Sequence, residues 1–198
     1  EHASAEDICQ VFVAINTYLK QAGFRKCIYK PIPWIYQQQP AEEDLYALFK
    51  ECHAQICVRN IAAVIDMKHP PKWYNIRKSG ARKAQESGIH IEESEDYATF
   101  WSILNENLMN TYHAQPVHTL QEMNRLKASF PDNIKLYVAR AETGKMLGGT
   151  VLYISRKVVH TQYISASEEG KQSHALDALF QNLIKIRYKD FDYFDFGT

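Results

Sequence analysis

The segment Tyr163–Ile184, YISASEEGKQSHALDALFQNLI, holds residues whose types and order suit the binding of a phosphate. A strand-like run ends near Ser165, and the turn Glu169–Gln172 leads into an amphipathic helix. Unpaired N–H groups at the start of a helix favour the binding of a phosphate. A glycine lets the ligand approach the backbone closely, and a nearby cation adds attraction; Gly170 is such a glycine and Lys171 such a cation. The alternative is a plain strand-to-helix connection with Gly170 in a left-handed conformation.

A second candidate site is a run of cations in the segment Lys72–Ser87, which has helical periodicity. Its charge is one-sided, because no acidic residue occurs between positions 67 and 85. On a helix of about 100° per residue, Arg77 borders the apolar face, whereas Lys78 and Arg82 point away from it. The run therefore has two interpretations: a solvated helix face, or a site that holds an anionic substrate.

The cysteines do not indicate a metal centre. All of them, Cys9, Cys27, Cys52 and Cys57, lie in the first third of the chain, and their spacing matches no zinc pattern. We expect reduced, mostly buried thiols and no bound metal.

The composition predicts a globular protein. The chain has 198 residues, of which 45% are hydrophobic, enough for one large domain or two small ones. Lysine plus arginine equals aspartate plus glutamate, so the net charge gives no general argument for a DNA partner or an anionic membrane. No apolar run approaches the roughly 20 residues of a membrane span, and we expect a cytoplasmic location. Because the sequence starts at Glu1 rather than at a methionine, we expect a fragment of a longer chain.

The first 70 residues predict two helices and several strands. Apolar positions at helical spacing indicate a helix from about Ala5 to Gly23, and AEEDLYALFKEC indicates a second, short one. The segments FRKCIYKPIPWIY and ICVRNIAAVIDM alternate or are rich in β-branched residues, so we expect strands there.

The remaining residues predict a helical part followed by a meander of strands. After the short strand GIHIEE come two helices, Glu95–Tyr112 and Thr119–Ser129, the second with the capping-box pair Thr119 and Glu122. Three strands joined by tight turns follow, IKLYVARAE, MLGGTVLYIS and VVHTQYISAS, and predict an antiparallel meander. A helix from about Lys171 to Tyr188 then crosses over to a last strand in FDYFDFGT, beside the third.

This order of elements resembles the core of the GNAT acetyltransferase fold, in which the pyrophosphate of acyl-CoA binds where the fourth strand meets the next helix. The segments RKSGARKAQESGI, FWSILNENL, PVHTLQEM, HTQYISASEEGKQSHALDALF and YFDFGT more closely resemble the acetyltransferase-like proteins related to the Fem peptidoglycan aminoacyltransferases. The resemblance covers most of the chain. It implies an α+β protein with a mixed, mainly antiparallel sheet flanked by helices.

The resemblance also implies parts of two tandem domains, since the Fem relatives carry two GNAT-like domains. Residues 1–70 correspond to the second half of a first domain, residues 71–88 to a basic connecting helix, and residues 89–198 to a second domain truncated after its fifth strand. The sequence departs from acetyltransferases proper, because the glutamine/arginine-x-x-glycine-x-glycine/alanine loop is replaced by SEEGKQSHA. Two acids in this loop are unfavourable beside a pyrophosphate.

Catalytic residues follow from the same resemblance, in which the fourth and fifth strands splay and present the reacting groups. Acyl transfer to an amine needs a base, a donor to the carbonyl and a proton for the leaving group. Strand alternation places His160 and Tyr163 on opposite faces, with Tyr163 as the proton donor. Asp195, whose aromatic neighbours favour a raised pKa, is the candidate base, with Asp192 as the less buried alternative. His118 is an equal candidate, and His160 a further one; each histidine is otherwise an ordinary partly buried residue.

The acyl donor is expected along the backbone of Ile164, Ser165 and Ala166, with the phosphates of acyl-CoA or acetyl-CoA at the turn Glu169–Gln172. Aminoacyl-tRNA would also use the basic helix, through Arg77 and its neighbours Lys78 and Arg82.

The sequence thus predicts an acyltransferase that moves an acyl group from acyl-CoA to a small-molecule or peptide amine by direct attack. Two alternatives remain open. One is a Fem-like aminoacyltransferase that uses aminoacyl-tRNA in cell-wall peptide synthesis, and the other is a non-catalytic, ligand-binding member of the fold.

Overall fold

The computed structural model describes residues 3–198, which form two compact units. The first unit ends at Ile61, and the second comprises Ala62–Thr198. The basic helix predicted as a connector lies within the second unit, and the predicted domain boundaries at residues 70 and 88 stay a prediction. That the first unit is half of a tandem GNAT-like domain stays a prediction.

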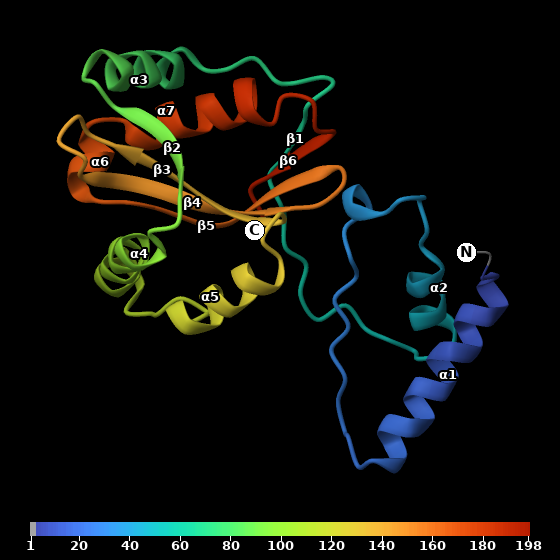
Figure 1. Cartoon of the computed structure of the whole chain (residues 1–198). Helices are drawn as coiled ribbons and strands as arrows, with labels where there is room; N and C mark the ends of the chain where they lie inside the picture. Colours follow the sequence, from blue (N-terminus) through green and yellow to red (C-terminus); the bar gives the residue numbers. More distant parts are fainter. Residues whose placement is uncertain (1–2) are drawn as a thin grey trace. The chain divides into compact units, whose positions relative to one another are not determined.

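Over its described residues, 3–61, the first unit has two α-helices, one 3₁₀ turn and irregular segments (Figure 1). Helix α1, Ala5–Gln21, is capped by Ser4 and contacts α2, Glu43–Lys50; a single 3₁₀ turn, η1, spans Trp34–Tyr36. The strand predicted in FRKCIYKPIPWIY is wrong, because residues 24–33 have no regular structure. Prolines remove ladder donors, and within this unit the structure describes no strand with which the segment could pair.

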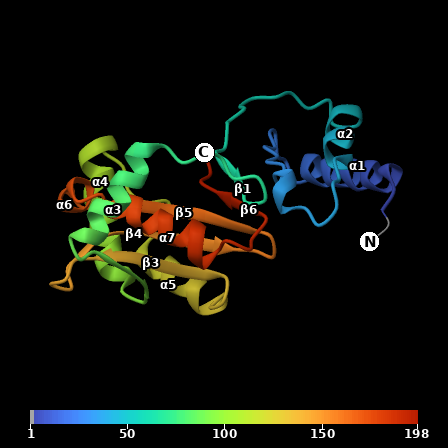
Figure 2. The same ribbon diagram turned by 90° about the horizontal axis from the view of Figure 1, so that it is seen from above.

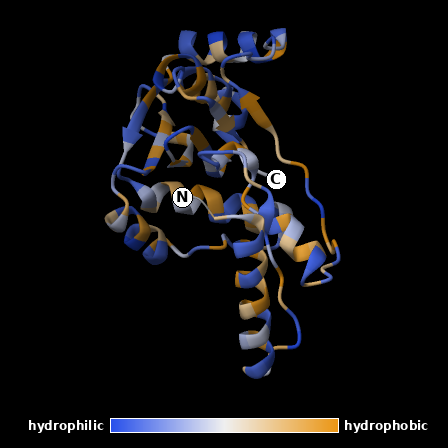
Figure 3. Ribbon diagram, turned by 90° about the vertical axis from the view of Figure 1, so that its right-hand side faces the viewer, coloured by the Kyte–Doolittle hydropathy of each residue, from blue (hydrophilic) through white to orange (hydrophobic). Residues whose placement is uncertain are grey.

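Many large apolar side chains of the first unit are exposed. Polar and apolar residues are interspersed along α1 (Figure 3), and Val11 on this helix is 50% exposed. Of the cysteines, Cys9 is buried, but Cys27 and Cys57 are exposed, so the prediction of mostly buried thiols was wrong.

The second unit is built on one six-stranded sheet with the order β1-β6-β5-β4-β3-β2 (Figures 1 and 2). The strands are β1 Val64–Asp66, β2 His90–Ser94, β3 Ile134–Arg140, β4 Met146–Ile154, β5 Val158–Ala166 and β6 Tyr193–Asp195. Strands β2 to β5 form an antiparallel meander, and β6 lies parallel to β5. The predicted mixed, mainly antiparallel sheet is confirmed. Of the one long strand, or two strands joined by a turn, expected in ICVRNIAAVIDM, only β1 forms, and it pairs antiparallel with β6.

Helices cover both faces of this sheet (Figure 1). The helices α4, Tyr97–Tyr112, and α5, Leu120–Ser129, lie on one face, and α3, Asn75–Glu86, and α7, Ala175–Asn182, lie on the other. Phe100 and Met123, on α4 and α5, pack against Leu136 and Val151 of the sheet. On the opposite face, Leu179 of α7 packs against other sheet residues. The α+β architecture is therefore as predicted.

The connection from β5 to β6 differs in detail from the single helix that the sequence predicted. It consists of a short helix α6, Glu168–Gln172, then α7, and a π-helical turn, η2, over Leu183–Arg187. Between α6 and α7 the backbone of His174 is left-handed, with φ 59°. In the described part of the chain, no helix is long and apolar enough to cross a membrane.

Candidate functional site

The candidate site lies where β5 continues past the end of its pairing with β6. Strand β6 pairs only with Val158–His160, whereas β4 pairs with β5 as far as Ala166. Beyond His160, β5 therefore has a strand neighbour on one side only within the sheet. A strand edge without a neighbour presents backbone N–H and C=O groups that can bind an extended ligand.

A β-bulge interrupts β5 at the start of this edge. The consecutive β4 residues Val151 and Leu152 pair with Tyr163 and Thr161, so Gln162 is an extra residue on β5. An extra residue of this kind shifts the alternation of side chains between the two faces.

The bulge brings His160 and Tyr163 to the same face of the sheet. His160 pairs with Tyr153 and Tyr163 pairs with Val151, and both partners belong to the core under α4 and α5. The prediction from simple alternation, that these two side chains lie on opposite faces, was wrong.

His160 forms a hydrogen-bonded pair with Asp195 on β6. The His160 Nδ1 lies 3.0 Å from Oδ2 of Asp195, whose other oxygen accepts the backbone N–H of Gly197 at 2.8 Å. Asp195 is buried, with 4% of its surface exposed, whereas the His160 side chain is 24% exposed. A carboxylate that accepts from Nδ1 keeps the proton there, so that neutral His160 has its Nε2 lone pair available as a base.

This geometry assigns the predicted aspartates different positions. Asp195, predicted as the base, is the partner that orients His160. Asp192 forms an ion pair with Lys68, at 3.0 Å between Oδ1 and Nζ.

Tyr163 and His118 are a second pair on the same face. The Tyr163 Oη lies 2.6 Å from His118 Nδ1 and also accepts the backbone N–H of His118 at 3.2 Å. The indole of Trp101 packs edge-on against Tyr163, and its Nε1 donates to the His118 carbonyl at 3.3 Å. The segment before α5 thus meets α4 and β5 at the Tyr163 hydroxyl, which can exchange a proton with His118.

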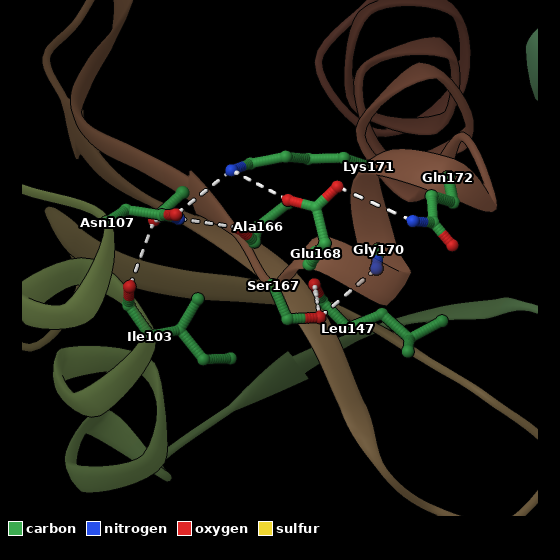
Figure 4. A network of polar contacts seen from close by, with 10 residues as sticks. Ile103, Asn107, Leu147, Ala166, Ser167, Glu168, Gly170, Lys171 and Gln172 are labelled. Atoms are coloured by element: carbon green, nitrogen blue, oxygen red, sulfur yellow. Dashed lines mark hydrogen bonds and ion pairs between the residues drawn. The ribbon is translucent and has the colours of Figure 1, made fainter. Parts of the chain in front are cut away.

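Asn107 of α4 joins the end of β5 to α6 (Figure 4). Its Nδ2 donates to Ser165 Oγ at 2.7 Å and to the Ala166 carbonyl, and its Oδ1 accepts from Lys171 Nζ at 3.1 Å. Asn107 is not among the site residues predicted from the sequence. A signal was present, because Asn107 lies one turn after Leu104 and so brings a polar group to the apolar side of the helix.

The predicted phosphate turn is largely satisfied by its own contacts. Ser167 caps α6, and its Oγ accepts the Gly170 N–H at 3.1 Å. Gly170 is helical, so neither a left-handed turn nor a free N–H is present at this residue. A side chain is excluded there for another reason, since a Cβ on Gly170 would overlap the carbonyl oxygen of Leu147.

The cations near α6 are paired with its acids. Lys171 Nζ lies 3.4 Å from Glu168 Oε2, and Lys145 Nζ lies 2.6 Å from Glu169 Oε2. Gln172 donates to Glu168 at 3.5 Å. A phosphate at this turn would have to displace these partners. Ile164, the remaining predicted contact to the donor, is on the open edge of β5 and is 36% exposed.

The basic helix is α3, which packs on α7. Arg77 Nη1 lies 3.0 Å from Oδ1 of Asp177 on α7, whose side chain is 11% exposed. Arg82 lies 3.7 Å from Glu86, and Lys78 is exposed. The ion pair with Asp177 gives Arg77 a structural role between two helices, and its binding of a substrate stays a prediction. Over the described residues, no group of three or more metal-ligating side chains occurs.

Comparison with known proteins finds a family whose model matches most of the second unit. A model of the family described as "Acetyltransferase (GNAT) domain" matches residues 73–198. No curated protein matches the sequence.

Among solved structures, the fold is similar to FemX, with a TM-score of 0.58 and 10% identity over 69% of this chain and 52% of that one. It is also similar to the C-terminal domain of a protein assigned as a lysylphosphatidylglycerol synthetase from Agrobacterium fabrum, with a TM-score of 0.51 and 12% identity over 69% and 46% of the two chains. L-PGS from Bacillus licheniformis gives a TM-score of 0.50 and 11% identity over 69% and 46%. The chain thus spans about half the length of these structures.

Proposed function

The chain belongs to the family of GNAT acetyltransferase domains, and on that basis we propose that it is an acyltransferase that moves an acyl group from acyl-CoA to an amine. The observation that carries this proposal is the open edge of β5 from Gln162 to Ala166, next to the pairs His160–Asp195 and Tyr163–His118. The thioester arm of acyl-CoA or acetyl-CoA would add to this edge as an extended chain. The thioester carbonyl would then face the two pairs.

In the proposed reaction, the amine attacks the thioester carbonyl directly. Nε2 of His160 takes the proton of the amine, and Asp195 stabilises the imidazolium that forms. A C–N bond forms, the C–S bond breaks, and the thiolate takes the proton of Tyr163 Oη. The Tyr163 phenolate regains a proton from solvent through His118, whose Nδ1 lies 2.6 Å from that oxygen, and His160 releases its proton to solvent. A catalytic role for each of these residues is part of the proposal.

Asn107 has a positioning role in this proposal. Its amide holds the Ser165 hydroxyl and the Ala166 carbonyl, the last groups of the open edge. The Asn107 side chain also accepts a hydrogen bond from Lys171 of α6. A movement of α6 on binding a CoA phosphate would therefore shift Asn107 and the end of the open edge that it holds. Lys171 would exchange Glu168 for the phosphate, which removes the ion pair seen at 3.4 Å.

The acids of α6 favour a second candidate, transfer from an aminoacyl ester such as aminoacyl-tRNA. Glu168 and Glu169 neutralise Lys171 and Lys145, so the turn offers no net positive charge to a pyrophosphate. An acyl donor whose phosphates bind elsewhere avoids this cost. The Fem-like resemblance of the sequence agrees with such a donor, and Lys78 on α3 is an exposed cation for it.

Hydrogen exchange with added donor tests the proposal at the open edge. Acetyl-CoA should slow amide exchange in the peptide that covers Tyr163–Ala166 and leave β2 unchanged, because only the first gains backbone hydrogen bonds. Acetyl-CoA that binds without protecting this peptide would contradict the assigned position. Failure of acetyl-CoA to bind, with protection by an aminoacyl-tRNA, would select the second candidate.

Turnover is the complementary test. We expect release of CoA from acetyl-CoA in the presence of a panel of amines, and its loss in Tyr163→Phe. Binding of donors without turnover of any of them would favour the non-catalytic alternative.

A further inference from the structure

A cleft of about 510 Å³ adjoins the candidate site, between α4 and the segment that leads into α5. The residues that line it include Trp101, Glu106, Met109, Pro116, His118 and Leu120. His118 connects the cleft to the candidate site, because its Nδ1 lies 2.6 Å from the Tyr163 hydroxyl. A molecule in this cleft would therefore lie near the groups to which the acyl transfer is assigned.

The lining combines apolar side chains, the uncharged polar residues Asn105, Gln115 and Thr119, and one carboxylate. Among the lining residues, Glu106 and His118 have the only ionisable side chains, and none is a lysine or arginine. Within the described structure, the exposed carboxylate of Glu106 makes no side-chain hydrogen bond or ion pair, in contrast to the acids of α6. The side chains of Trp101, Met109 and Leu120 supply apolar surface. An unpaired carboxylate beside apolar walls attracts a cation and repels an anion.

We propose that this cleft binds the acceptor, and that the acceptor is a cationic amine that carries an apolar or aromatic group. The inference rests on the proposed acyl transfer and names the class of its amine substrate. The apolar part lies against Met109 and Leu120, and Glu106 supplies the counter-charge. Phosphorylated and carboxylated acceptors are disfavoured by the same carboxylate.

The indole N–H of Trp101 is a suitable probe of binding, since it donates to the His118 carbonyl at the wall of the cleft. Its NMR signal, assigned with Trp34→Phe and Trp73→Phe variants, is followed during titration with phenethylamine, without an acyl donor. Phenylethanol and phenylpropionate are the neutral and anionic analogues. We expect the amine to bind about two- to fivefold more tightly than the alcohol, as for a partly exposed ion pair, and less so at high salt.

Two cleft variants and one control locate the effect. Glu106→Gln should remove the preference for the amine over the alcohol, and Met109→Lys should reverse it by adding a cation. Met109 is 46% exposed, so its replacement leaves the fold intact, which circular dichroism checks. Glu6→Gln, on α1 and outside the cleft, should change nothing.

Equal affinity for amine and alcohol, tighter binding of the carboxylate, or an undiminished preference in Glu106→Gln would each overturn the inference. The titration needs no donor, so failure of acyl transfer leaves its outcome unaffected. Acyl transfer to amines by a Glu106→Gln variant with unchanged KM would overturn the cleft assignment while the proposed function stands.

Discussion

Replacing Asp195 by asparagine separates the two bases that the sequence and the structure suggest. In the parent structure, the Gly197 N–H donates to Asp195 Oδ1 at 2.8 Å. The asparagine side chain has the same shape as aspartate, and its oxygen can still accept this hydrogen bond. Its amide nitrogen, in place of Oδ2, would donate to Nδ1 of His160. The imidazole proton would then move to Nε2, and the lone pair that takes the amine proton would be lost.

The size of the effect follows from the burial of this pair. Asp195 is 4% exposed, so water has little access to replace its carboxylate. A positioned general base contributes about 10²- to 10⁴-fold to the rate, or roughly 3 to 5 kcal/mol. We expect Asp195→Asn to lower kcat/KM within this range and to leave the melting temperature nearly unchanged.

The assay is acyl transfer by Asp195→Asn, His160→Gln and the double variant. If the two residues act as one unit, each single variant costs about as much as the double. Nitrogen NMR of His160 should show its proton on Nδ1 in the parent protein and on Nε2 in Asp195→Asn. Full activity in His160→Gln, with activity lost in Asp195→Asn, would refute our reasoning and return Asp195 to the role of base.

Three further changes test other parts of the structure. Asn107→Ala removes two hydrogen bonds at the end of β5 and should weaken donor binding by about 1 to 3 kcal/mol in a calorimetric titration, whereas Asn110→Ala should not. Gly170→Ala should destabilise the protein by about 1 to 3 kcal/mol in urea unfolding, because its Cβ overlaps Leu147; unchanged stability would contradict that packing. Two hydrogen bonds from the cap residue Thr119 lower the pKa of Glu122, so this carboxylate stabilises the fold above its ordinary pKa and the stabilisation is lost as the pH falls through the lowered value. Acid unfolding of Thr119→Ala should accordingly depend less on pH in that range.

The second unit could be predicted from the sequence where local signals agree with the tertiary structure. The tight turns between β3, β4 and β5 fix the meander, and the capping box at Thr119 forms as expected, with Glu122 reaching back to the Thr119 N–H at 2.8 Å. The strands predicted in the first unit do not form, because there the local signals disagree with the tertiary structure. A strand needs a partner, and local composition does not show that the partner is missing.

The candidate site was predicted in part. Tyr163, His118, His160 and Asp195 were all named from the sequence, but their pairing was not. The pairing of Tyr163 with His118 depends on the bulge at Gln162, which no turn residue in the sequence indicates and which reverses the face of Tyr163 relative to His160. The pairing of His160 with Asp195 depends instead on the register of β5 against β6. Simple alternation predicts which side chains share a face of the sheet, and this prediction is wrong where a β-bulge inserts one extra residue into the strand.

The pairing of β1 with β6 has a consequence for the order in which the protein folds. Val64 lies opposite Asp195, so this contact closes a loop that contains nearly all of the second unit. Contacts so distant along the chain carry a large closure entropy and form late, after the local hairpins of the meander. An intermediate with an intact meander would therefore hold His160 on β5, and it would lack the partner Asp195 until β6 joins the sheet.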